Sequence, residues 1–186
     1  MCSRLFALKY RLAAGPPLKI GNPISAALID GLAEYRYFLD LGFEPENILV
    51  GGDSASAIIA YQLVQYTAIQ LDAAYPPVAL AGCLPASEID TAWLSPSSLN
   101  IPNVELKGMF FKFSPTFILA GEAKMCRASM RVLWERMRVD MGVKVTYLKV
   151  AKPPHDLVGF EFMEPERSFA KRKIARWTDK VLSGSR

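Results

Sequence analysis

The hexapeptide Gly51-Gly52-Asp53-Ser54-Ala55-Ser56 decides how this chain is interpreted. It follows a short apolar run, Ile48-Leu49-Val50, and precedes a longer apolar run, 57–64, that is typical of a helix. A strand, a sharp turn with a serine at its apex and then a helix form the setting of a nucleophile elbow. The turn presents the serine hydroxyl, and the unpaired N–H groups of the first helical turn face a developing negative charge. The hexapeptide therefore marks Ser54 as a candidate nucleophile.

The same residues also fit a helix N-terminus without a catalytic role, because Ser and Asp are common helix caps. The usual elbow reads Gly-x-Ser-x-Gly, and Ser56 stands here in place of the last glycine. A glycine at that point lets helix and strand pack closely. The local sequence leaves both interpretations open, and the rest of the chain has to distinguish them.

The composition indicates one folded domain over residues 1–186, since 51% of the residues are hydrophobic and 22% are charged. No apolar run approaches the ~20 residues that span a bilayer, and Lys9 and Arg11 interrupt the N-terminus too early for a signal peptide. We therefore expect a cytoplasmic protein without a membrane span. A single histidine and three scattered cysteines do not make a ligand set, so we expect no metal and no cofactor.

Strand-like and helix-like segments alternate along the chain. Strands are expected at 6–12, 48–50, 78–83, 116–120 and 143–150, and helices at 23–41, 54–72, 126–141 and 165–182. This alternation predicts the α/β class, with a mostly parallel sheet and helices on both faces. Ligands of such sheets bind beyond the carboxyl ends of the strands. The loops after 48–50, 116–120 and 143–150 are therefore expected along one rim.

The only histidine, His155, lies in the loop that follows the last expected strand. A lone histidine is more often a surface or structural residue. Its place after Ser54 and after the strand at 116–120 matches the order nucleophile, acid, histidine of one fold in particular.

On these residues the chain resembles the hormone-sensitive-lipase-like esterases of the α/β-hydrolase superfamily, over nearly its whole length. The stretches that carry the resemblance are Tyr10-Arg11-Leu12-Ala13, the helix 23–37, Gly52-Asp53-Ser54-Ala55, Phe117-Ile118-Leu119-Ala120-Gly121-Glu122 and His155-Asp156. The resemblance implies an α/β-hydrolase fold that lacks its N-terminal strands. Strand edges exposed in this way invite association, so a homo-oligomer is an open alternative.

The resemblance further implies hydrolysis of a small-molecule carboxylic ester through an acyl-enzyme. Ser54 is the expected nucleophile, His155 the general base, and the N–H of Ala55 an oxyanion donor. Gly52 and Asp53 belong to the elbow, where Asp53 is expected to be a structural hydrogen-bonding residue.

The acid position of the expected site departs from the family pattern. Lys124 stands at the position where the family has Asp or Glu, and a lysine cannot accept the imidazole N–H bond. Glu122, two residues earlier, is the candidate that replaces it. Asp156 adjoins His155, and a direct neighbour has unsuitable geometry in most cases.

Residues 84–112 are expected to form a lid or acyl-pocket region. Its apolar side chains have core packing as an equal alternative: Trp93, Leu94, Met109, Phe110 and Phe111. The family's His-Gly-Gly-Gly oxyanion loop has no counterpart in this sequence. That absence and Lys124 favour a second hypothesis, a catalytically inactive hydrolase-fold protein that binds an apolar ligand or a partner subunit.

The basic segment 167–176 is compatible with a nucleic-acid patch, given a net charge of +4. The simpler interpretation is the solvated face of a C-terminal helix, because Phe169, Ile174, Trp177 and Val181 form an apolar stripe at helical spacing. We therefore expect no nucleic-acid partner.

Overall fold

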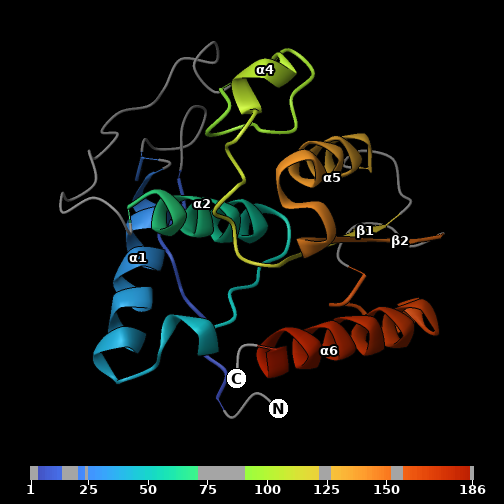
Figure 1. Ribbon diagram of the computed structural model, residues 1–186. Coiled ribbons are helices and arrows are strands. Elements are labelled where there is room, and N and C mark those ends of the chain that lie inside the picture. Colours follow the sequence, from blue (N-terminus) through green and yellow to red (C-terminus); the bar gives the residue numbers. More distant parts are fainter. Residues whose placement is uncertain are drawn as a thin grey trace. The chain divides into compact units, whose positions relative to one another are not determined.

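A computed structural model describes residues 4–13, 21–23, 25–70, 91–121, 127–151 and 157–184. The chain divides into two compact units, Met1–Ser87 and Glu88–Arg186, and each is described by itself. Helices and a two-stranded parallel sheet make the protein mixed α/β, as the sequence predicts (Figure 1). In the described ranges the sheet has only these two strands, so the larger parallel sheet stays a prediction, as does the single domain. The strand expected at 78–83 lies outside the described residues.

The first unit contains two long helices, α1 (Ser25–Asp40) and α2 (Ala55–Gln70), with a short 3₁₀ turn, η1 (Pro45–Asn47), between them. Both long helices agree with the sequence prediction to within a few residues. Gly42 adopts φ +84° and ends α1, and the N–H of Phe43 donates back to the carbonyl of Phe38 at 3.1 Å. A Cβ on Gly31 of α1 would lie 3.7 Å from Ile59 of α2, so the two helices pack closely at this glycine.

The strand expected at 6–12 is not formed. The backbone N–H of Arg11 donates to Asp30 of α1 at 2.8 Å, and the ring of Phe6 meets that of Phe38 at 5.6 Å between centroids. The segment therefore packs against a helix and uses a side-chain acceptor where a strand would use a neighbouring strand. An isolated parallel bridge between Ala13 and Asn22 follows it.

The run 48–50 is extended but forms no strand in the structure as described. Ile48 has φ −104° and ψ 120°, which are β-region angles. A β-ladder also needs a partner for its N–H and C=O groups. The described residues supply no such partner, so the predicted buried strand before the elbow is not formed. Its extended backbone at Ile48 agrees with the prediction.

The second unit is built around strands β1 (Thr116–Gly121) and β2 (Val145–Val150). They pair in parallel with Thr116 opposite Val145 and Gly121 opposite Val150. Helix α5 (Arg127–Met141) and the 3₁₀ turn η2 (Gly142–Lys144) connect them, so β2 begins two residues later than predicted. The other elements of the unit are α4 (Asn103–Leu106), η3 (Glu161–Met163) and α6 (Glu166–Gly184).

Helices α5 and α6 cover opposite faces of the strand pair (Figure 1). On one face Trp134 of α5 stacks on Tyr147 of β2, with 5.4 Å between ring centroids. On the other face Phe117 of β1 meets Trp177 of α6 at 5.5 Å. The side next to α6 also contains a buried apolar cluster, which includes Val150 of β2 and Ala170 of α6. Its members are Val150, Leu157, Met163 and Ala170, and Leu119 and Leu148 pack against it. Alternate strand residues thus serve the two layers, as a parallel sheet covered on both sides requires.

Candidate functional site

The turn at 52–56 has an unusual backbone at its centre. Ser54 adopts φ +53°, the only positive φ of a non-glycine residue among the described residues. This left-handed conformation is costly for an L-residue with a side chain, and such residues concentrate at functional sites. The side chain of Ser54 is exposed, and α2 begins at the next residue. A serine at the tip of a strained turn before a helix is the local arrangement that the sequence predicts.

Gly52 is required by a close approach of two backbone segments. A Cβ built on it would collide with the backbone carbonyl of Ser56 and lie 2.6 Å from the nitrogen of Ala57. The first glycine of the motif therefore makes room for the first turn of α2. By contrast, a Cβ on Gly51 would meet nothing within 4 Å.

Ser56 fits where the usual motif has glycine, because its hydroxyl turns back onto the elbow. The Asp53 N–H donates to Ser56 Oγ at 2.8 Å, and this hydroxyl donates to the Asp53 carbonyl at 2.6 Å. The carbonyl of Asp53 also accepts from the Ser56 N–H at 3.0 Å. The departure from the motif thus closes the turn, and it does not disrupt the approach that Gly52 permits.

The amide of Ala55 is available for an oxyanion. It stands at the first position of α2, where the helix has no carbonyl to accept its N–H. The N–H groups of the next two residues are already engaged with Asp53 and Ser54. Within the described part of the chain the Ala55 N–H has no acceptor, so an oxygen bound beside Ser54 could accept from it.

Farther along α2, buried polar groups line the helix. Burial raises the pKa of Tyr61 far above its ordinary value, so the phenol stays neutral at any physiological pH. Gln65 is fully buried, and neither amide atom finds a hydrogen-bond partner in the described structure. The sequence does not predict the burial of either residue. Helix α2 is apolar along most of its length, so its sequence does not indicate which positions are buried.

The two motifs upstream of the elbow meet each other. Arg11 of the Tyr-Arg-Leu-Ala stretch donates from Nη2 to Oδ1 of Asp30 at 2.7 Å and from Nε at 3.0 Å. These hydrogen bonds lower the pKa of Asp30 below its ordinary value. The resemblance singled out both stretches separately, and the structure shows that they form one bidentate pair.

The remaining predicted site residues, Glu122 and His155, lie outside the described residues. The chain leading to each is described. Glu122 directly follows Gly121, and the last residue of β2, Val150, is the register partner of Gly121. The segments that hold Glu122 and His155 therefore begin at the same edge of the sheet, which belongs to the second unit, whereas the elbow belongs to the first.

The proposed lid region, 84–112, is described from residue 91. Its five predicted lining residues have different roles. Phe110 is fully buried and meets Phe113 at 5.4 Å, whereas Phe111 is 75% exposed, and Trp93, Leu94 and Met109 are partly buried. For Phe110, core packing describes the position better than pocket lining, because the side chain is fully buried.

Arg136 of α5 holds this region in place. Its Nη1 donates to the carbonyls of Pro96 and Ser98, and its Nη2 to that of Ile101, each at 2.7 Å. Nε donates to Asn103 Oδ1 at 3.0 Å. One turn later on α5, Asp140 accepts from the N–H groups of Gly108 and Phe110 at 3.0 Å.

A groove of about 440 Å³ lies beside this anchor, within the second unit. Its lining comes from α5 and from the region of α4: Leu99, Asn103, Val104, Leu106, Lys107, Val132, Glu135, Arg136, Val139 and Asp140. Its volume falls in the range of small-molecule sites, roughly 300–1,000 Å³. The groove is not predictable from the sequence, because Arg136 contacts residues more than thirty positions away and no local pattern indicates such a contact.

Among the described residues no group of three or more His, Cys, Asp or Glu is placed to hold a metal ion. No helix there combines the length and apolarity needed to cross a membrane.

Comparisons with models of protein families, with curated proteins and with solved structures each found no match to this chain.

Proposed function

We propose that this protein is a carboxylic ester hydrolase of the α/β-hydrolase kind, with Ser54 as its nucleophile. The observation that carries the proposal is the backbone of the elbow. Ser54 has φ +53° directly before α2, and Gly52 has no room for a side chain beneath it. A nucleophile elbow needs this combination, since a strained turn exposes the hydroxyl and a close approach sets the helix behind it. A simple helix cap needs neither.

In the proposed reaction Ser54 Oγ forms a bond to the ester carbonyl carbon. His155 accepts the hydroxyl proton and returns it to the departing alcohol, which leaves an acyl-enzyme. The N–H of Ala55 donates to the carbonyl oxygen as it becomes negative. Water then attacks the acyl-enzyme with the same histidine as base, the bond from the acyl carbon to Ser54 Oγ breaks, the carboxylic acid is released and Ser54 regains its proton.

Glu122 is proposed as the acid that orients His155. Support comes from the parallel register, because the segments after β1 and β2 start side by side at Gly121 and Val150. Lys124 cannot take this role, since an ammonium group has no acceptor.

The test is hydrolysis of p-nitrophenyl acetate and butyrate by the full chain, together with labelling by a fluorophosphonate. Ser54→Ala should lower kcat/KM on the order of 10³-fold or more and abolish labelling, because it removes the nucleophile. Ser183→Ala, an exposed serine at the end of α6, is the matched control and should change neither readout. Equal turnover by Ser54→Ala and the unaltered protein, both shown folded by circular dichroism, would refute the proposal.

Glu122→Gln then tests the proposed acid. It should lower kcat with little change in KM, because the carboxylate acts on the histidine and does not touch the substrate. A kcat unchanged by this substitution would remove Glu122 from the site while leaving Ser54 in it.

The groove beside α4 favours a second candidate function, binding of an apolar ligand without catalysis. Three of its aliphatic side chains are at least 76% exposed, namely Leu99, Val104 and Val139. An anilinonaphthalene sulfonate probe should bind there, and Val139→Asp should weaken its binding while Val143→Asp, outside the groove and 98% exposed, should not. Probe binding together with absent esterase turnover would favour this function over the first.

A further inference from the structure

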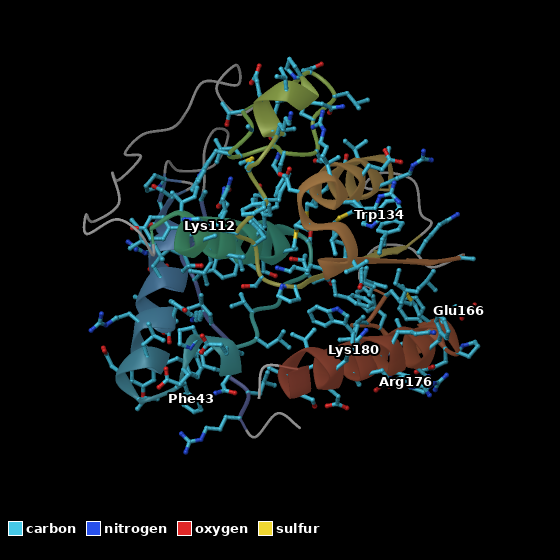
Figure 2. All side chains as sticks on the ribbon, viewed as in Figure 1. Phe43, Lys112, Trp134, Glu166, Arg176 and Lys180 are labelled. Atoms are coloured by element: carbon cyan, nitrogen blue, oxygen red, sulfur yellow. The ribbon has the colours of Figure 1, made fainter. Side chains whose placement is uncertain are left out.

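The outward side of α6 is strongly basic. Five exposed residues share one face of the helix, because each lies three, four, seven or eleven positions from Phe169; they are here named the α6 basic face: Phe169, Arg172, Lys173, Arg176 and Lys180. The residues on the opposite stripe, among them Ala170 and Thr178, are buried against the rest of the second unit. Figure 2 labels Arg176 and Lys180 along this helix, with Glu166 at its first turn.

The cations of the α6 basic face have no acidic partner in the part of the chain that the structure describes. In the described structure none of the four makes a salt bridge, whereas nearby Arg167 is paired with Glu164 at 3.4 Å. The acidic residues of the helix, Glu166 and Asp179, lie at the margins of the face by helical spacing. Lys173 contacts an aromatic ring instead, its ammonium 5.4 Å from the ring centroid of Phe169. The face therefore presents four positive charges to the solvent and to any binding partner.

Two exposed phenylalanines precede this helix. Phe160 and Phe162 stack with 5.3 Å between ring centroids and 28° between ring planes. Phe162 is 78% exposed and Phe160 is 44% exposed. Between this pair and α6, the buried Met163 packs in the same cluster as Ala170 of α6. A fixed turn thus holds a pair of apolar rings in water next to the start of the basic helix.

We propose that the α6 basic face, together with Phe160 and Phe162, is a docking surface for an anionic lipid membrane. Basic side chains attract the negative headgroups, and exposed apolar rings gain free energy when they enter the boundary with the acyl chains. The two features lie on consecutive elements of one packed unit. This proposal does not depend on the hydrolase activity.

The aromatic geometry favours a lipid surface over a single-stranded nucleic acid. Bases stack on free ring faces. Here Phe160 and Phe162 cover one another, and Lys173 lies over a face of Phe169. Insertion into lipid needs only exposed apolar area, and Phe162 is 78% exposed.

The experiment is co-sedimentation of the full-length chain with vesicles of phosphatidylcholine alone or with roughly one third phosphatidylserine. Binding is expected only with phosphatidylserine, and it should weaken between about 0.1 M and 0.5 M NaCl because salt screens the charges. The variant R172Q/K173Q/R176Q/K180Q should lower the partition coefficient by roughly 100-fold or more. Phe162→Ala should lower it by roughly tenfold.

Matched controls separate a localised surface from general charge. K9Q/K107Q/K144Q/K171Q removes the same number of positive charges, four, from exposed lysines outside the α6 basic face. One of these lysines, Lys171, lies on the same helix. This variant should retain most of the binding. Phe111→Ala, which alters a ring 75% exposed elsewhere, should have no effect. Circular dichroism and thermal unfolding establish that every variant is folded.

Four outcomes would overturn the proposal. They are no binding of the unaltered chain to the phosphatidylserine vesicles, equal binding to neutral vesicles, equal loss in the two quadruple variants, and tighter binding to a single-stranded oligouridine than to the vesicles. The last outcome would assign the face to nucleic acid.

Discussion

Gly52 shows how one absent side chain determines the geometry of the elbow. Its α-carbon faces the backbone of Ser56 and Ala57 so closely that no Cβ fits, and backbone cannot move aside as a flexible side chain can. The sequence motif already contains a glycine here. Its reason, a through-space approach of the following helix, becomes visible only in the structure.

Gly52→Ala should lower the free energy of unfolding by about 1–3 kcal/mol, because the methyl group forces the turn away from α2. Gly51→Ala, one residue earlier and in open space, should change it by less than about 0.5 kcal/mol. Urea unfolding of both variants measures the difference. Similar stability of the two would show that the close approach is absent in solution.

Asp30 gives a pH dependence to the first unit. Its hydrogen bonds from Arg11 lower its pKa in the folded protein. The stability that they contribute is therefore present above the ordinary aspartate pKa of about 3.9 and is lost as the pH falls through the lowered value. Asp30→Asn should lower the melting temperature at pH 7 and lower it progressively less below about pH 4. A difference that stays constant from pH 7 to pH 2 would contradict this.

At the scale of elements, α5 organises the segment before β1 through two of its own side chains. Arg136 gathers three carbonyls and an amide oxygen, and Asp140 receives two N–H groups. The segment between residues 96 and 110 has little regular structure, so these bonds replace the ladder or helix that would otherwise satisfy its backbone. The groove beside α4 exists because this segment is held at a fixed place.

Arg136→Met should destabilise the protein by about 1–3 kcal/mol, since the carbonyls that it satisfies are left without their charged donor. Hydrogen exchange of residues 98–113 should accelerate with it. Arg131→Met is the control, because this exposed residue pairs only with Glu135 on the surface and should cost less than about 1 kcal/mol. Unchanged exchange in Arg136→Met would mean that the segment is held by other contacts.

The elements that the sequence predicted correctly are those defined by local chemistry. The long helices α1, α5 and α6 have apolar positions at helical spacing, α2 is apolar along most of its length, and α1 ends at the expected Gly42. Strands β1 and β2 are rich in apolar and β-branched residues, and they pair with each other in parallel. Segments 6–12 and 48–50 are also largely apolar, although 6–12 has no β-branched residue. A strand, however, is completed by a partner, and composition cannot tell whether the partner is a strand or, as for Arg11, the carboxylate of a helix.

In the candidate site, too, local features were predictable from the sequence, and contacts between distant residues were not. The turn at Ser54 and the helix after it agree with the motif, whereas the strand expected before the turn is not formed among the described residues. The compensating role of Ser56, the Arg11–Asp30 pair and the groove beside Arg136 do not follow from the motif, because each depends on atoms that only the fold brings together. The motif suggested that a glycine at position 56 permits the close approach, whereas in the structure Gly52 permits it and Ser56 hydrogen-bonds to Asp53.

For the whole molecule, the charge balance predicts colloidal behaviour. The net charge of +4 and a pI near 9.0 keep molecules apart at neutral pH. Light scattering should therefore show the lowest solubility near pH 9. Either quadruple glutamine variant removes four charges, which leaves a formal net charge of 0 at pH 7, so both should move the minimum toward neutrality. Solubility independent of pH would show that apolar contacts, and not net charge, control association.

The left-handed backbone of Ser54 also places two properties of the protein in competition. Glycine adopts this conformation without penalty, so Ser54→Gly is expected to remove a strain of about 1 kcal/mol. In a chain of this size that gain raises the melting temperature by about 2–4 °C. The same substitution deletes the hydroxyl on which the proposed chemistry depends. A screen for heat tolerance and a screen for turnover would therefore select opposite residues at this one position.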